Sequence, residues 1–173
     1  MFDIDSSLII DAMNFYKSIG YTPFKVPLIV DHESSWQTKP NDRKDLHHIS
    51  GVYVASAEQS FIDLIIKGKI QKGRYCAITP CYRDEPVLDE THLNIFLKIE
   101  LVSIGIRHDV IDDAFSFMSK FSECEIINTD IGQDIEVNKI EVGSYGKRVI
   151  NGVDLYYGTG LAEPRFSYAV NKR

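Results

Sequence analysis

The stretch that decides the fold is CYRDEPVLDETHLNIFLKIE, residues 81–100, in which the polar turn PVLDET joins two β-rich segments. We expect these segments, 74–85 and 92–104, to form a long hairpin. Apolar residues in the second segment alternate strictly with the set Asn94, Phe96, Lys98 and Glu100. Successive side chains of a strand point to opposite faces, so this set shares one face. A short hairpin brings that face together with Arg83 and Glu85 over a single pocket.

The remaining chain predicts helices and shorter strands. Helical spacing of apolar residues favours helices at 5–19, 57–67 and 111–121, with a short helix from Glu163 after a Gly-rich turn. Further strands are expected at 21–30, 52–55, 125–129, 135–142 and 148–156, and a loop at 31–48. Prolines within 21–30 place that strand at an edge or an interface. We therefore predict an α+β fold, a mainly antiparallel β-sheet flanked by helices, as one domain over 1–173.

Composition limits the functional classes. The chain has 173 residues, a formal net charge of −6 and three cysteines. An acidic balance argues against a broad electrostatic grip on nucleic acid, so tRNA binding receives no support from charge. No apolar run reaches the roughly 20 residues that cross a bilayer, which predicts no membrane partner. The acidic N-terminus and the odd cysteine count predict a cytoplasmic protein.

The residues of the hairpin suit a nucleoside triphosphate. Arg83 can hold a phosphate through two hydrogen bonds, and His92 can reach another phosphate. Phe96 can stack on a base, and Glu85 can accept the amino group of adenine. A second segment, GTGLAEPRF at 158–166, combines glycines that allow close backbone approach with an arginine that can clamp phosphate.

The two segments resemble motifs 2 and 3 of the class II aminoacyl-tRNA synthetases. Motif 2 in that family is an aromatic-Arg-x-Glu, a loop, and a basic residue four before a Phe; the matching residues here are Tyr82, Arg83, Glu85, His92 and Phe96. The matching residues of motif 3 are Gly158, Gly160, Ala162 and Arg165. A degenerate motif 1 is similar to FYKSIGYTPFKVPLIV, with Pro27 as its key proline. The three motifs occur in family order. Within the family, the resemblance leans toward the seryl-type branch through Ala-Glu at 57–58, Phe-x-Lys-x-Glu at 96–100 and GTGLA at 158–162.

The resemblance implies roles for the nucleotide-binding residues. Arg83 would hold and polarise the α-phosphate of ATP during attack by an amino-acid carboxylate, and Arg165 would stabilise the γ-phosphate, which makes both catalytic. Glu85 would bind adenine, Phe96 and Arg165 would sandwich its ring, His92 would contact the γ-phosphate, and Gly160 would lie against the nucleotide. Catalysis in the family is largely orientation and charge stabilisation on the phosphates, with Mg²⁺ assisting.

The resemblance also implies metal and amino-acid ligands. Glu141 in IEVGSYG is the first candidate for chelating the ATP-bound Mg²⁺, and Glu100 is the second. The run ASAEQ stands where many members bind the amino-acid ammonium group, which selects Glu58, with Gln59 beside it. Glu100 is a further amino-acid ligand. Each has a plainer interpretation: Glu141 as a surface strand residue, and Glu58 as an acid that stabilises a helix N-terminus.

These implications lead to one functional hypothesis with two alternatives. A minimal synthetase-like ligase core would activate an amino acid as its adenylate and pass it to a tRNA, a carrier or a protein. The chain would form a homodimer through the Pro27 region. Eight residues follow Arg165, which predicts no anticodon-binding domain. The first alternative is a non-catalytic paralogue that serves as a nucleotide-binding accessory or regulatory subunit. The second is full aminoacylation with the tRNA held by another chain.

Overall fold

The computed structural model describes residues 3–38 and 44–172. Its five helices over these residues are α1 (Ser6–Ser18), α2 (His32–Trp36), α3 (Ala57–Ile66), α4 (Val110–Met118) and α5 (Arg165–Asn171). The strands of the large sheet are β1 (Thr22–Pro23), β5 (Gly73–Tyr82), β6 (Ile95–Ile104), β7 (Glu125–Thr129), β8 (Gly132–Val137), β9 (Ile140–Ile150) and β10 (Val153–Glu163). The strands of the small sheet are β2 (Ile29–Val30), β3 (His47–His48) and β4 (Gly51–Tyr53).

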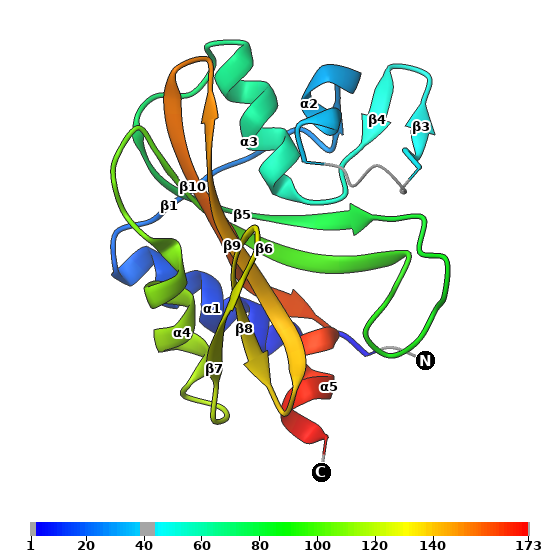
Figure 1. Cartoon of the computed structure of the whole chain (residues 1–173), viewed down its shortest axis with the longest axis vertical. Coiled ribbons are helices and arrows are strands. Elements are labelled where there is room, and N and C mark those ends of the chain that lie inside the picture. The colour runs from blue at the N-terminus through cyan, green and yellow to red at the C-terminus, as the bar shows by residue number, and fades with distance from the viewer. Residues whose placement is uncertain (1–2, 39–43, 173) are drawn as a thin grey trace.

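The large sheet runs in the order β1-β5-β6-β10-β9-β8-β7 (Figure 1). Every pair is antiparallel except β1 with β5, which is parallel. The central hairpin β5–β6 pairs Gly73 with Ile104 and Tyr82 with Ile95. These observations confirm the predicted α+β fold, the mainly antiparallel sheet and the long hairpin.

Helices cover both faces of the large sheet. Helices α1, α4 and α5 pack on one face around a core that includes Tyr16, Leu101 and Phe117. Helix α3 packs on the other face, over Val102 and Ile104. The small sheet lies beside α3 and α2 in Figure 1. Helix α3 covers only one end of this face of the sheet, and the other end remains accessible to a ligand.

Two predicted segments between residues 21 and 48 are wrong in part. The expected strand at 21–30 is divided: β1 is an edge strand of the large sheet, as its proline predicts, whereas β2 belongs to the small sheet. Within the expected loop at 31–48, the structure has α2 and β3. The backbone N–H of Phe24 donates to the carbonyl of Cys76 just after Pro23, and the chain then leaves the large sheet.

The predicted strands at 135–142 and 148–156 are also wrong, because each spans a tight turn. Asn138 and Lys139 have φ of 50° and 63°, and Asn151 and Gly152 have φ of 49° and 76°. Positive φ at both central residues is the geometry that favours two-residue hairpin turns. The segment 158–160, expected as a turn, lies within β10 at a bulge between Thr159 and Leu161.

Candidate active site

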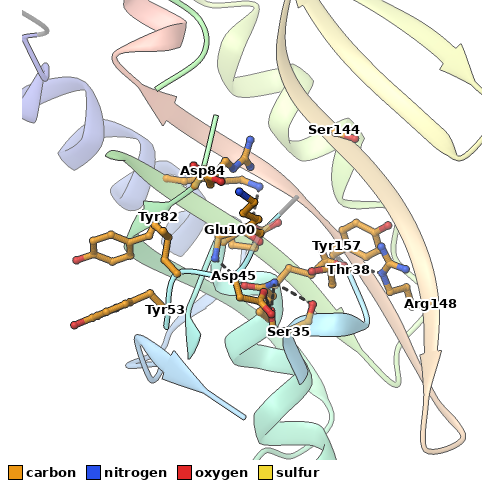
Figure 2. Close-up of a pocket in the computed structure, with 18 of the residues that line it drawn as sticks. Ser35, Thr38, Asp45, Tyr53, Tyr82, Asp84, Glu100, Ser144, Arg148 and Tyr157 are labelled. Carbon is orange, nitrogen blue, oxygen red and sulfur yellow. Dashed lines mark hydrogen bonds and ion pairs between the residues drawn. The ribbon is translucent and has the colours of Figure 1, made fainter. Parts of the chain in front are cut away.

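A pocket of about 280 Å³ lies on the open end of the face that α3 covers (Figure 2). The start of α3, the end of β5, and strands β6, β9 and β10 all contribute side chains to its wall. The lining residues that carry charge or hold the wall in place include Glu58, Gln59, Arg83, Lys98, Glu100 and Arg148. The pocket therefore brings together residues far apart in sequence, such as Glu58 and Arg148, which are 90 positions apart.

The polarity of the pocket follows from the alternation along β6. Phe96, Lys98 and Glu100 share a face with Val102 and Ile104, because side chains two residues apart point the same way. Val102 and Ile104 pack under α3, whereas Lys98 and Glu100 line the pocket. One strand face thus changes from site to core along its length, and the predicted common face of Phe96, Lys98 and Glu100 is confirmed.

Glu100 is a buried carboxylate at the centre of the pocket, with only 1% of its surface exposed. Lys98 Nζ lies 2.9 Å from Glu100 Oε2 as an ion pair. Neither carboxylate oxygen accepts a well-directed hydrogen bond from the residues that the structure describes. Burial raises the pKa of Glu100 to about 7, and the charge of Glu58 adds to the rise, while Lys98 opposes it. A buried acceptor without a donor is costly unless a ligand supplies the donor.

Glu58 forms a second ion pair on the pocket wall. It is the second residue of α3, and its Oε1 accepts a hydrogen bond of 2.8 Å from Arg148 Nε on β9. The guanidinium carbon of Arg148 lies over the ring of Tyr157 on β10, 5.2 Å from the ring centroid. Burial raises the pKa of Glu58, although Arg148 acts against that rise. Both predicted acidic ligands, Glu58 and Glu100, therefore lie in the same pocket.

Gln59 uses its amide to fix the pocket wall. Its Oε1 accepts from the backbone N–H of Ala55 at 2.7 Å, and its Nε2 donates to the Ser35 carbonyl at 3.1 Å. The side chain is 2% exposed and joins α2 to the start of α3. Its contacts in the structure are therefore structural, and they position Glu58, the preceding residue of α3.

A second group of residues, the Phe96 cluster, consists of Arg83, Phe96 and Arg165. The guanidinium carbon of Arg83 lies 4.8 Å from the centroid of the Phe96 ring, and that of Arg165 lies 6.0 Å from it. Both distances fit cation–π contact. Arg83 also lines the pocket, so it joins the Phe96 cluster to the pocket.

Arg165 begins α5 and reaches back to the loop between β5 and β6. Its Nε and Nη2 donate to the backbone carbonyl of Thr91 at 2.9 and 2.6 Å. Its Nη1 lies 3.8 Å from Glu141 Oε1. Burial lowers the pKa of Arg165, with Glu141 opposing the shift. The structure thus holds this cation against a loop carbonyl, beside the Phe96 ring.

The two other predicted nucleotide ligands lie in or next to that loop. Glu85 is buried, and its Oε1 lies 3.9 Å from Arg83 Nη1. His92 is exposed, with Nδ1 3.0 Å from Asp89 Oδ1. Hydrogen bonds from the backbone and hydroxyl of Thr91 lower the pKa of Asp89, and His92 adds to that shift. His92 therefore has an acidic neighbour in the loop.

Glu141 and Glu100 differ as candidates for a magnesium ion. The side chain of Glu141 is 51% exposed, whereas Glu100 is buried against Lys98. Mg²⁺ in nucleotide sites uses one or two carboxylates with waters and phosphates. The cation nearest Glu141 in its ion pair, Arg165 Nη1, is 3.8 Å away, whereas Lys98 Nζ lies 2.9 Å from Glu100. Over the described ranges, no three His, Cys, Asp or Glu residues gather as a metal site. Of the two carboxylates, Glu141 is therefore the more accessible to an ion.

Gly160 has a packing reason for being glycine. A Cβ atom there would lie 2.9 Å from the Tyr16 ring and 3.0 Å from Ile99 Cγ2. The Tyr16 hydroxyl also donates to the Gly160 carbonyl at 2.7 Å, which fastens α1 to the bulge of β10. The absence of a side chain at Gly160 thus lets the backbone of β10 pack closely against Tyr16 and Ile99 in the core.

Sequence reasoning missed Arg148, the partner of Glu58. The expected strand at 148–156 placed Arg148 at a strand start, whereas it lies near the end of β9, three residues before Asn151 in the turn. The useful signal is the β-turn pair Asn151-Gly152, which marks the hairpin and gives Arg148 the same face as Ile150.

None of the helices described is both long and apolar enough to cross a membrane.

Comparison with known proteins identifies the fold. No protein-family model and no curated protein matches the sequence. Two solved pyrrolysyl-tRNA synthetase structures from Desulfitobacterium hafniense match with TM-scores of 0.72 and 0.73, at 15% and 16% identity over 94% of this chain. This chain covers 65% and 67% of those chains. Cytoplasmic serine-tRNA ligase from Naegleria fowleri, in complex with AMP, matches with a TM-score of 0.69 at 12% identity, over 95% of this chain and 47% of that one.

The fold is therefore that of a class II aminoacyl-tRNA synthetase catalytic core. Both pyrrolysyl- and seryl-type enzymes are among its structural neighbours, so the lean toward the seryl-type branch receives no specific support. Identities of 12–16% establish the fold alone.

Proposed function

We propose that the protein binds ATP and an amino acid and joins them as an aminoacyl adenylate. The Phe96 cluster would hold the nucleotide, and the pocket would hold the amino acid. Arg83 borders both, so it stands where the α-phosphate and the amino-acid carboxylate must meet. The bond that forms is between the carboxylate oxygen and the α-phosphorus, and pyrophosphate leaves.

The observation that carries the proposal is the buried carboxylate of Glu100, which accepts no well-directed hydrogen bond from the described residues, in the same pocket as Arg83. Lys98 Nζ lies 2.9 Å from Glu100 Oε2, and the carboxylate can still accept from a ligand. An amino acid offers one charged group to Glu100 and one to Arg83. Its ammonium group would donate to Glu100, and its carboxylate would pair with Arg83. A buried carboxylate and a guanidinium in one pocket of about 280 Å³ thus complement a zwitterion.

The Phe96 cluster supports the nucleotide half of the proposal. An adenine ring would stack on Phe96 where the guanidinium groups of Arg83 and Arg165 now lie, and it would meet the carboxylate of Glu85. The displaced guanidinium groups would then bind phosphates, with His92 contributing from the loop. Gly160 would support this region through the position of β10, and Gln59 would support the pocket through the position of Glu58.

Magnesium would assist at Glu141. When bound, the ion neutralises phosphate charge and so favours departure of pyrophosphate. Arg165, 3.8 Å from Glu141, would hold the γ-phosphate end of the nucleotide in place. The remaining proposals concern assembly and acceptor: a homodimer formed through the Pro27 region, and a tRNA, a carrier or a protein as acceptor.

The test is amino-acid-dependent exchange of radioactive pyrophosphate into ATP with Mg²⁺, screened over the twenty common amino acids. We expect exchange with at least one of them, because the reaction is reversible at the adenylate. Glu100→Gln should raise the KM for the amino acid about tenfold or more while the Kd for ATP stays the same. Exchange with none, by protein that still binds ATP, would support a nucleotide-binding accessory subunit instead.

A further inference from the structure

The Glu58–Arg148 pair lines the pocket without having a role in holding the ends of an amino acid. Glu100 and Arg83 already supply an acceptor for the ammonium group and a cation for the carboxylate. Glu58 and Arg148 share the same pocket from α3 and β9. Glu58 is 8% exposed, and burying a carboxylate beside an arginine costs desolvation free energy. A role in ligand binding would explain why the chain retains the pair at this cost.

The pair presents one donor group and one acceptor group to the pocket. Arg148 Nε donates to Glu58 Oε1 at 2.8 Å. Arg148 also interacts with the side chain of Tyr157, over whose ring its guanidinium lies. With respect to the described residues, Glu58 Oε2 can still accept a hydrogen bond, and the terminal nitrogens of Arg148 carry further N–H groups. A ligand group next to the pair must therefore accept a hydrogen bond from Arg148 and donate one to Glu58.

Charge excludes ionised side chains from this position. An acidic side chain would place its carboxylate against Glu58, and a basic side chain would place its cation against Arg148. An aliphatic side chain would remove water from both groups without replacing its hydrogen bonds, which costs more than it gains. The group that fits is neutral and polar.

We propose that Glu58 and Arg148 determine the specificity of the pocket, and that its substrate is an amino acid with a side-chain carboxamide. The amide oxygen accepts from Arg148, and the amide nitrogen donates to Glu58. Because oxygen and nitrogen are separate atoms side by side, a carboxamide meets both groups at once. A hydroxyl must serve both through a single oxygen. This inference rests on the proposed function, since it takes Glu100 and Arg83 as the ligands of the amino-acid backbone.

Binding and exchange are measured in parallel on the same protein. Isothermal titration with asparagine, glutamine, aspartate, glutamate and serine, in the presence of a non-hydrolysable ATP analogue, reports binding. Pyrophosphate exchange with the same five reports activation. We expect asparagine or glutamine to bind at least a hundredfold more tightly than the corresponding acid and than serine, because a site built for hydrogen bonds rejects a ligand that leaves them unmade.

Two variants separate specificity from mere structural support. Arg148→Met keeps the length of the side chain and should weaken carboxamide binding at least tenfold. Its matched control is Lys147→Met, because Lys147 is the adjacent residue of β9, lies outside this pocket and pairs with Asp154 at 3.1 Å. Glu58→Gln removes the charge that repels acids, so it should reduce the preference for carboxamide over acid at least tenfold. A structural role alone would change all ligands equally.

Each outcome decides between the two proposals. Carboxamide binding with exchange supports both, and carboxamide binding without exchange supports the pocket assignment while overturning adenylate formation. Exchange with serine or an acid as the preferred substrate overturns the carboxamide inference and leaves adenylate formation standing. Neither binding nor exchange with any amino acid overturns both.

Discussion

The pocket and the Phe96 cluster differ in how their cations are held. In the pocket, Lys98 and Arg148 each pair with a carboxylate, at 2.9 and 2.8 Å. In the Phe96 cluster, Arg83 and Arg165 lie against an aromatic ring and a backbone carbonyl, and the carboxylates of Glu85 and Glu141 lie 3.9 and 3.8 Å from them. Short ion pairs fix a site before ligand arrives, whereas cations held by looser contacts can be drawn away by phosphate. We therefore expect the pocket to be preformed and the Phe96 cluster to rearrange around its ligand.

The largest effect is expected from removing Arg83, the residue that belongs to both the pocket and the Phe96 cluster. Arg83→Ala should lower the rate of pyrophosphate exchange about 100- to 1000-fold, since it removes a donor aimed at the developing charge. The matched control is Arg107→Ala, because Arg107 is exposed outside the site. An exchange rate equal to that of the control would remove Arg83 from the reaction.

Removing the second cation of the cluster should have a smaller effect. Arg165→Ala should weaken ATP binding about 10- to 100-fold, which is the range for a lost hydrogen bond to a charged group. Titration calorimetry with ATP measures this, again beside Arg107→Ala. Amino-acid binding in the absence of ATP should stay within twofold of the wild type. A variant that binds ATP normally would contradict the assignment of Arg165.

The preformed pocket predicts a cost in stability when its wall is loosened. Gln59→Met removes the hydrogen bonds to Ala55 and Ser35 and should lower the free energy of unfolding by about 1–3 kcal/mol. Urea denaturation measures the change. Gln133→Met is the control, because the amide of Gln133 makes an exposed contact with Asn128 at the edge hairpin, and it should change stability by less than about 0.5 kcal/mol. Equal effects in the two variants would show that the wall is not fixed through Gln59.

The smallest expected effect is a pH dependence set by Glu100. Its pKa is raised to about 7, so the carboxylate that attracts an ammonium group forms as pH rises from 6 to 8. The KM for the amino acid should fall by up to about tenfold over that range, and Glu100→Gln should abolish the change. A KM that is independent of pH in the wild type would contradict the role of Glu100.

The raised pKa of Glu100 also makes the stability of the fold depend on pH: binding of the amino acid should improve as pH rises, whereas stability should fall. Folded Glu100 keeps its proton to higher pH than the unfolded chain, whose carboxyl titrates near 4.5. The folded state thus binds more protons between about pH 4.5 and 7, and the free energy of unfolding falls as pH rises through this window. Glu100→Gln should flatten this slope in thermal unfolding experiments. A wild-type slope that the variant retains would assign the effect to another group.

The sequence was most informative where the alternation of side chains is strict. The hairpin β5–β6 and the common face of Phe96, Lys98 and Glu100 follow from strand periodicity alone, and the structure confirms both. The turns at Asn138–Lys139 and Asn151–Gly152 were missed because the apolar residues on either side of each were joined into one expected strand. Asn-Gly at 151–152 is a hairpin signal that the sequence does contain.

Long-range pairing is what the sequence could not supply. Arg148 approaches Glu58 only because β9 lies beside β10 in the large sheet and α3 packs on both strands; the two residues are 90 positions apart. Gln59 was expected as a ligand because it follows Glu58, but its partners on α2 and before α3 come from tertiary packing. Residue type identified candidate groups, and topology decided which of them meet.

The most direct test of the central claim is pyrophosphate exchange by the wild-type protein with ATP, Mg²⁺ and each of the twenty common amino acids. We expect the wild-type protein to exchange pyrophosphate with at least one amino acid. The exchange should be lost in Arg83→Ala and retained in Arg107→Ala. Protein that binds ATP and amino acid but exchanges pyrophosphate with none of the twenty would contradict it.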